Sequence, residues 1–114
     1  MNDKFLSFLG IAKKSGNLIF GMDEVKSKLL SGNIHLVLVT ADISEKSFKK
    51  IESFVAEKFS EISLIKLDYT KDDIEKITKK YAAIIGVSDI NIARKISLIL
   101  EQKSERNDVY NDKI

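Results

Sequence analysis

The sequence predicts an α/β protein, a three-layer α-β-α sandwich around a mixed, mostly parallel four-stranded sheet. Helical and strand patterns alternate along the chain, and only a few residues connect one element to the next. Two strand segments, HLVLVTA (35–41) and AAIIGVS (82–88), are almost continuously apolar. Such runs are typical of strands that are covered by helices on both faces, as in a parallel sheet.

The first third of the chain contains two helices and a short strand. Apolar residues recur at helical spacing in KFLSFLGIAKK, and Gly16 ends this segment. The segment NLIF at 17–20 is a short strand candidate that leads into Gly21. The next segment, MDEVKSKLL, has its apolar residues on one helical face, and Ser31 and Gly32 end it.

The remaining elements follow the strand at 35–41. The segment DISE resembles a capping box, with Asp42 as the cap and Glu45 three residues later. The helix after it is expected to bury Phe48, Ile51, Phe54 and Val55. The other expected elements are an outer strand at 62–67, a helix that TKDD (70–73) opens with Ile74 and Ile77 inward, the strand at 82–88, and a last helix from about Ile90 to Gln102.

A single domain is expected over residues 1–102, since no internal repeat or interdomain linker interrupts the pattern. The polar segment 103–114 is expected to fray or to be disordered. No stretch approaches the ~18 uninterrupted apolar residues of a membrane span, and the first residues fit a helix better than a signal peptide. The absence of cysteine excludes disulfides and thiolate metal sites. Together these features favour a cytoplasmic protein.

Residues that could carry catalysis are few. The five glycines form no phosphate-binding loop, and the lone histidine, His35, has no nucleophile or second ligand beside it in the sequence. Asp42 follows a buried strand, where α/β sheets place ligands, but a role as helix N-cap also accounts for it. Asp68, Asp72 and Asp73 resemble a metal cluster only superficially, since helix starts favour acidic residues. The sequence therefore predicts no catalysis, cofactor or metal.

Three pairs of lysines favour a binding function instead. Each pair alone is typical of a solvated helix face. The strand at 82–88 is expected to be central, so the loop before it could lie near the start of the second helix. Lysines beside the free N–H groups of a helix start make a suitable phosphate receptor. The pairs are Lys13 and Lys14, Lys26 and Lys28, and Lys79 and Lys80.

Three stretches match a known family in order and spacing: LGIAKKSGNLIFGMDEV, SGNIHLVLVTADIS followed by a lysine-rich helix, and AAIIGVSD. In these stretches the chain resembles the kink-turn RNA-binding ribosomal proteins (the L-seven-Ae family), most closely the short bacterial YlxQ-like members. The resemblance covers about residues 5–100. It implies the same fold and a structured RNA as partner, either ribosomal RNA or another RNA that contains a kink-turn.

The chain departs from the family where RNA is recognised. RNA-binding members read G-[TA]-N-E-x-x-K after the first strand. The glycine and glutamate are kept here, whereas the asparagine position holds Asp23 and the lysine position holds Ser27. The full segment is Gly21, Met22, Asp23, Glu24, Val25, Lys26, Ser27.

The chain also differs from the family at the end of the second strand, in the loop before the last strand and in the fourth helix. The Glu-Asp pair that the family has after its second strand appears as Ala41-Asp42, and an often acidic contact position is Ser44. The apolar loop that receives an extruded base in the family corresponds here to Thr78, Lys79, Lys80 and Tyr81. The Leu-Gly pair that the family has in its fourth helix is absent.

These departures change which groups the chain can offer to RNA. A kink-turn presents guanine edges whose acceptors are O6 and N7, to which asparagine and lysine can donate. An ionised Asp23 has no donor and repels phosphate. Lys26 lies one residue before the family's lysine position, so it points about 100° away around the helix.

We therefore expect a non-catalytic, ribosome-associated or structured-RNA-binding protein. The helix that begins at residue 22 would enter the groove, lysines would hold phosphates, and Tyr81 would stack on a base or belong to the core. The alternative is a protein-interaction module on the same fold that has lost kink-turn recognition. The expected RNA-binding residues are Lys13, Lys14, Gly21, Met22, Asp23, Glu24, Lys26, Ser27, Lys28, Ser44, Lys79, Lys80 and Tyr81.

Overall fold

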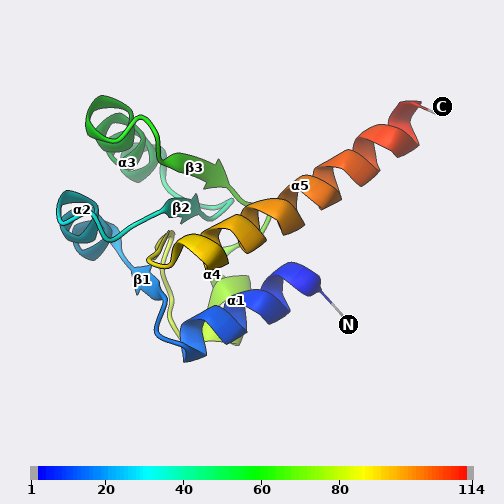
Figure 1. The fold of residues 1–114 in the computed structure, drawn as a ribbon, viewed down its shortest axis with the longest axis horizontal. Coiled ribbons are helices and arrows are strands. Elements are labelled where there is room, and N and C mark those ends of the chain that lie inside the picture. The colour runs from blue at the N-terminus through cyan, green and yellow to red at the C-terminus, as the bar shows by residue number, and fades with distance from the viewer. Residues whose placement is uncertain (1–2, 113–114) are drawn as a thin grey trace.

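Five α-helices and four β-strands alternate along the part of the chain that the structure describes (Figure 1). The structure is a computed structural model that describes residues 3–112, with side chains described through residue 102. The elements are α1 (Lys4–Lys14), β1 (Leu18–Phe20), α2 (Met22–Leu30), β2 (Leu36–Val39), α3 (Glu45–Lys58), β3 (Ser63–Lys66), α4 (Lys71–Thr78), β4 (Ile84–Val87) and α5 (Ile90–Asp112).

The four strands form one sheet in the order β1-β4-β2-β3. Strands β2 and β3 are parallel, whereas β4 runs antiparallel to both of its neighbours, β1 and β2. The predicted central position of β4 is confirmed, but the prediction of a mostly parallel sheet is wrong. A continuously apolar sequence indicates that a strand is buried on both faces. A central antiparallel strand is buried in the same way when helices cover both faces of the sheet, so the pattern does not reveal strand direction.

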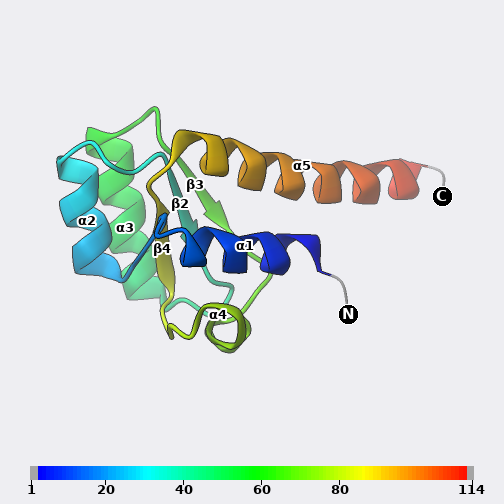
Figure 2. The ribbon, with the colours of Figure 1, turned by 60° about the horizontal axis from the view of Figure 1, so that its bottom comes forward.

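Helices cover both faces of the sheet, so the predicted three-layer arrangement is confirmed. Figure 2 shows α2 and α3 on one side of the strands and α1 and α5 on the other. Side chains alternate along β2: Leu36 and Leu38 join the core with α1, α4 and α5, whereas Val37 and Val39 join the core with α2 and α3. The two cores together bury most of the apolar residues that the sequence assigned to helices and strands.

The first two helices end in the same local structure. Gly16 follows α1 with a φ of +78°, and the side chain of Asn17 donates a hydrogen bond to the hydroxyl of Ser15 over 2.8 Å. The same three residue types at 31–33 repeat this arrangement after α2, with a φ of +78° at the glycine. Glycine adopts this left-handed conformation without steric cost, which is why it ends helices in a chain without proline.

The start of α3 differs from the prediction. Ser44 is its N-cap, and the Ser44 hydroxyl accepts a hydrogen bond from the amide of Ser47 over 3.1 Å. The prediction of Asp42 as this cap is therefore wrong. The Asp42 carboxylate instead accepts a hydrogen bond from the amide of Lys71 over 3.0 Å, at the start of α4. A capping box does occur at the start of α4, between Thr70 and Asp73.

Two other predictions about the helices need correction. Ile74 is buried as predicted, but Ile77 is 38% exposed and does not enter the core. Helix α5 continues beyond the expected end at Gln102 to Asp112, and it extends past the rest of the molecule in Figure 1. The last two residues of the predicted polar tail, 113–114, lie outside the described residues. No helix within the described range is long and apolar enough to cross a membrane.

Candidate nucleic-acid interface

Backbone hydrogen bonds join three segments at one end of the sheet. The amide of Gly21, just before α2, donates to the carbonyl of Ile84 at the start of β4 over 2.9 Å. The amide of Thr40, just after β2, donates to the carbonyl of Ala83 over 2.9 Å. The start of α2 and the loop before β4 therefore lie next to each other, as the sequence predicted.

The backbone of Gly21 exposes the start of α2. Its φ of 99° and ψ of 153° lie in a region that residues with a side chain rarely adopt, and no side chain caps the helix. Asp23 and Glu24 are exposed in the first helical turn. The first amides of a helix have no partner within it, so this helix start can donate hydrogen bonds to an anion.

A hollow of about 430 Å³ lies beside this helix start, along the open edge of β1. We call it the β1 hollow. Lys13 from α1, Lys28 from α2 and Lys80 from the loop before β4 line it, together with the single carboxylate of Glu24. The structure thus brings together one lysine from each of the three pairs that the sequence singled out. The excess of positive charge suits a phosphate-bearing ligand.

The floor of the β1 hollow was not predicted as part of a site. Leu18, Ile19 and Phe20 of β1 line it, together with Gly16. Phe20 is only half-buried and offers an aromatic ring on which a base could stack. The signal in the sequence was the short segment NLIF at 17–20, in which three apolar residues precede Gly21. This pattern predicts a strand, but it does not show that β1 lies at the edge of the sheet.

Other predicted residues lie around this surface but outside the β1 hollow. Lys14 and Lys79 line a second hollow of about 440 Å³ between α1 and α4, which Lys13 also lines; we call it the α1–α4 hollow. Tyr81 is 59% exposed, so the alternative that it belongs to the core is wrong. The ammonium of Lys71 lies 5.5 Å from the centre of the Tyr81 ring.

Four predicted residues on α2 and just before α3 have different surroundings. The ammonium of Lys26 lies 5.1 Å from the centre of the Phe54 ring, so this side chain faces α3 rather than the β1 hollow. The Ser44 hydroxyl caps α3, and Met22 packs against the core between the sheet, α2 and α3. Ser27 is exposed on α2 and does not line the β1 hollow.

Asp42 has a lowered pKa. Desolvation alone would raise the pKa of this carboxyl, but several neighbours favour its ionised form. They are the hydroxyl of Thr40, the backbone amides of Lys71 and of Asp42 itself, and the positive charge of Lys71. Together they lower the pKa of Asp42 below its ordinary value of 3.8. The ionised carboxylate thus holds the end of β2 to the start of α4.

The comparisons with known proteins show the fold. No protein-family model matches the chain, and no curated protein matches it. Among solved structures, the chain is similar to a protein of unknown function from Bacillus halodurans, with a TM-score of 0.79 and 23% sequence identity. The match covers 88% of this chain and 99% of the other. At this identity the likeness concerns the α/β fold alone.

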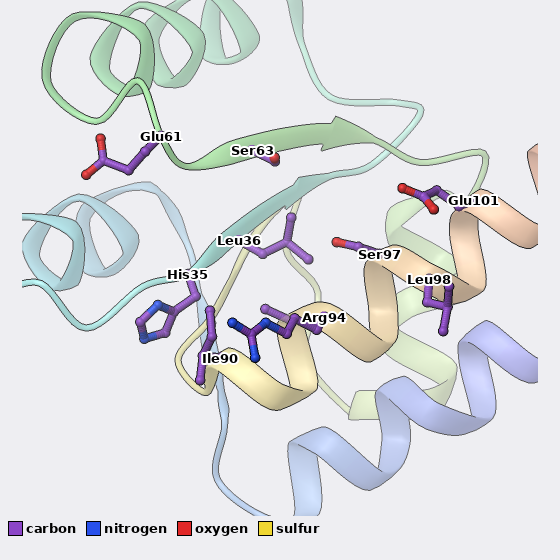
Figure 3. A pocket seen from close by; sticks show the side chains of 10 residues that line it. His35, Leu36, Glu61, Ser63, Ile90, Arg94, Ser97, Leu98 and Glu101 are labelled. Carbon is purple, nitrogen blue, oxygen red and sulfur yellow. The ribbon is translucent and has the colours of Figure 1, made fainter.

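A further hollow lies at the opposite end of the sheet, between β3 and α5 (Figure 3). It measures about 230 Å³, and its lining mixes His35 and Arg94 with Glu61 and Glu101. The backbone amide of His35 donates to the carbonyl of Val87, which fixes the start of β2. In the described part of the chain, no three His, Cys, Asp or Glu side chains gather so that they could hold a metal ion.

Proposed function

We propose that this protein is a non-catalytic, cytoplasmic RNA-binding protein of the kink-turn-binding (L-seven-Ae) type, associated with ribosomes or with another structured RNA. The observation that supports this function most directly is the β1 hollow. Lysines from three separate elements meet there beside an uncapped helix start and an exposed strand edge. Helix amides, ammonium groups and a nearby aromatic ring are the groups that bind phosphates and unpaired bases.

In this proposal the RNA contacts the start of α2 and the loop before β4 together. Lys13, Lys28 and Lys80 neutralise phosphates along the β1 hollow. The exposed ring of Tyr81 and the half-buried ring of Phe20 offer stacking surfaces for a base that leaves the duplex. Each lysine–phosphate contact releases counterions, so affinity should fall as salt is added.

The exposed face of α2 limits how well the protein can recognise bases. Asp23 and Ser27 stand where the family has a donor pair, and both side chains are exposed. A carboxylate accepts hydrogen bonds only, so Asp23 cannot donate to the O6 or N7 atoms of guanine. We therefore expect phosphate contacts to supply most of the affinity, with modest discrimination between RNAs.

A binding titration against a standard kink-turn RNA and a matched plain duplex tests this function. We expect binding to both RNAs at low salt. The logarithm of the affinity should fall with the logarithm of salt concentration with a slope of about −0.7 to −0.9 per phosphate contact. The proposal fails if neither RNA binds at low salt. The alternative, a protein-interaction module on the same fold, would then account better for the surface.

A further inference from the structure

The α1–α4 hollow has an apolar floor that is open to solvent. Leu6 and Ile11 of α1 and Ile77 of α4 line it, with Gly10 between them. Ile11 is 59% exposed and Ile77 is 38% exposed, so two of the large apolar side chains on the described surface meet at this one hollow. Exposed apolar side chains that gather at a hollow are typical of sites where another molecule binds.

Gly10 allows the two helices to approach closely at this hollow. A Cβ atom at this position would lie 3.1 Å from the Cγ2 atom of Ile77, which is tighter than ordinary contact. The buried hydroxyl of Thr78, the last residue of α4, donates to the carbonyl of Ile74 over 2.9 Å. The Thr78 hydroxyl therefore already has a partner within the protein. Ser7 brings the other hydroxyl of the lining, and the remaining side chains of the floor are apolar, so the floor favours an apolar occupant.

The rim of the α1–α4 hollow is positively charged. Lys13 and Lys14 stand at the end of α1, and Lys79 follows α4. No aspartate or glutamate is among the residues that line the hollow. An occupant that brings carboxylates would be attracted to this rim, and charge complementarity of this kind selects partners and speeds their association.

We propose that the α1–α4 hollow binds an acidic segment of another protein. A bulky apolar side chain of that segment packs between Ile11 and Ile77, and flanking carboxylates pair with Lys14 and Lys79. RNA fits the floor less well, because isoleucine and leucine offer neither hydrogen-bond donors nor an aromatic ring for a base. Since Lys13 lines both hollows, the protein partner would lie directly beside the β1 hollow.

Selection from a library of random 12-residue peptides, displayed on phage, tests this inference with the intact chain. We expect the bound peptides to be enriched in aspartate and glutamate around a leucine, isoleucine, methionine or phenylalanine. The variant Ile11→Gln with Ile77→Gln should bind a selected peptide at least about tenfold more weakly, because it removes two apolar contacts. Both positions are exposed, so the variant should stay folded.

Leu30→Gln is the matched control, since Leu30 is 65% exposed on α2 and lines neither hollow. It should bind the same peptide with unchanged affinity. Peptides without the acidic and apolar pattern, or peptides that bind the double variant equally well, would overturn the inference. The amides of Gly10 and Thr78 can be followed by NMR in titrations with the selected peptide and with single-stranded oligouridine. If their chemical shifts change with oligouridine and not with the peptide, the hollow binds nucleic acid instead. RNA binding at the β1 hollow is measured separately, so failure of one proposal leaves the other standing.

Discussion

The amide of Gly21 donates a hydrogen bond to the carbonyl of Ile84 over 2.9 Å, and this contact holds the start of α2 to the start of β4. Two segments more than sixty residues apart in the sequence therefore form one surface. The start of α2 is bonded to β4, and Lys80 belongs to the loop that leads into β4, so the backbone places Lys28 and Lys80 on the same surface. A preformed surface needs less ordering when a ligand binds.

Replacement of Gly21 by alanine tests how far this surface depends on backbone conformation. No atom lies within 4 Å of the position that a Cβ atom would take, so the substitution introduces strain without a clash. A non-glycine residue held in such a region costs about 1–3 kcal/mol. We expect the free energy of unfolding, measured with urea, to fall by about that amount. Ser27→Ala on the same helix is the control and should change stability little. Equal stability of Gly21→Ala and the parent protein would contradict this role of the backbone.

The carboxylate of Asp42 should make stability depend on pH. Its folded-state pKa is lowered, so its stabilising effect is present above the ordinary value of 3.8 and is lost as pH falls through the lower folded-state value. Asp42→Asn keeps an acceptor for the amide of Lys71 but removes the charge. We expect this variant to melt at a lower temperature than the parent protein at pH 7, and the difference to shrink below pH ~4. A difference that stays constant from pH 7 to pH ~2.5 would show that the charge has no role.

Two lysines on the β1 hollow should contribute to RNA affinity without sequence preference. We expect Lys28→Ala with Lys80→Ala to weaken binding to several RNAs by similar factors, because phosphate contacts carry little sequence information. The salt slope should decrease in magnitude by about 0.7–0.9 for each lost contact. The control is Lys49→Ala with Lys50→Ala, which removes the same charge from exposed positions on α3. If the control weakens binding as much, net charge rather than the hollow determines affinity.

Lys79 and Lys80 are adjacent in the sequence but line different hollows. If RNA occupies the β1 hollow, Lys80→Ala should reduce RNA affinity more than Lys79→Ala. If an acidic peptide occupies the α1–α4 hollow, the order should be reversed for that peptide. Titration of both single variants with a kink-turn RNA and with a selected peptide gives the comparison. Equal effects of the two variants on both ligands would show that the hollows do not act as separate sites.

The sequence predicted the elements well because their signals are local. Helical spacing, the glycines after α1 and α2, and the two continuously apolar strands each depend on a few neighbouring residues. The sheet was expected to be mostly parallel, but burial on both faces does not distinguish parallel from antiparallel pairing, and β4 is antiparallel to both of its neighbours. Asp42 was assigned to the wrong helix for a similar reason. Its partner, the amide of Lys71, lies 29 residues away, beyond the reach of a capping pattern.

The candidate site could be predicted only in part. The lysine pairs and the glycine before α2 are visible in the sequence. The expectation that β4 is a central strand led to the prediction that the loop before it lies near the start of α2. The exposure of Ile77 and the edge position of β1 depend on how α1 and β1 pack in three dimensions. Lys26 was expected at the site because it is only two residues from Lys28. In the structure it lies on another face of α2, with its ammonium over the ring of Phe54 on α3.

The exposed positions of Asp23 and Ser27 allow a direct test of RNA recognition by α2. Asp23→Asn with Ser27→Lys introduces the asparagine–lysine donor pair of the kink-turn-binding proteins, four residues apart on one helix face. The new asparagine could donate to a guanine edge, and the new lysine could reach its O6 or N7 atom. Both native side chains are exposed, so the variant should stay folded.

A well-placed base contact contributes about 1–3 kcal/mol of discrimination, and ~1.4 kcal/mol corresponds to a tenfold change. We therefore expect the double variant to bind a kink-turn RNA at least about tenfold more tightly, with little gain on a plain duplex. Asp23→Asn alone is the control, because the loss of its charge should favour both RNAs about equally. The ratio of the two affinities thus separates base recognition from electrostatic attraction. If the folded double variant leaves that ratio unchanged, α2 does not face RNA, and the proposed function fails with it.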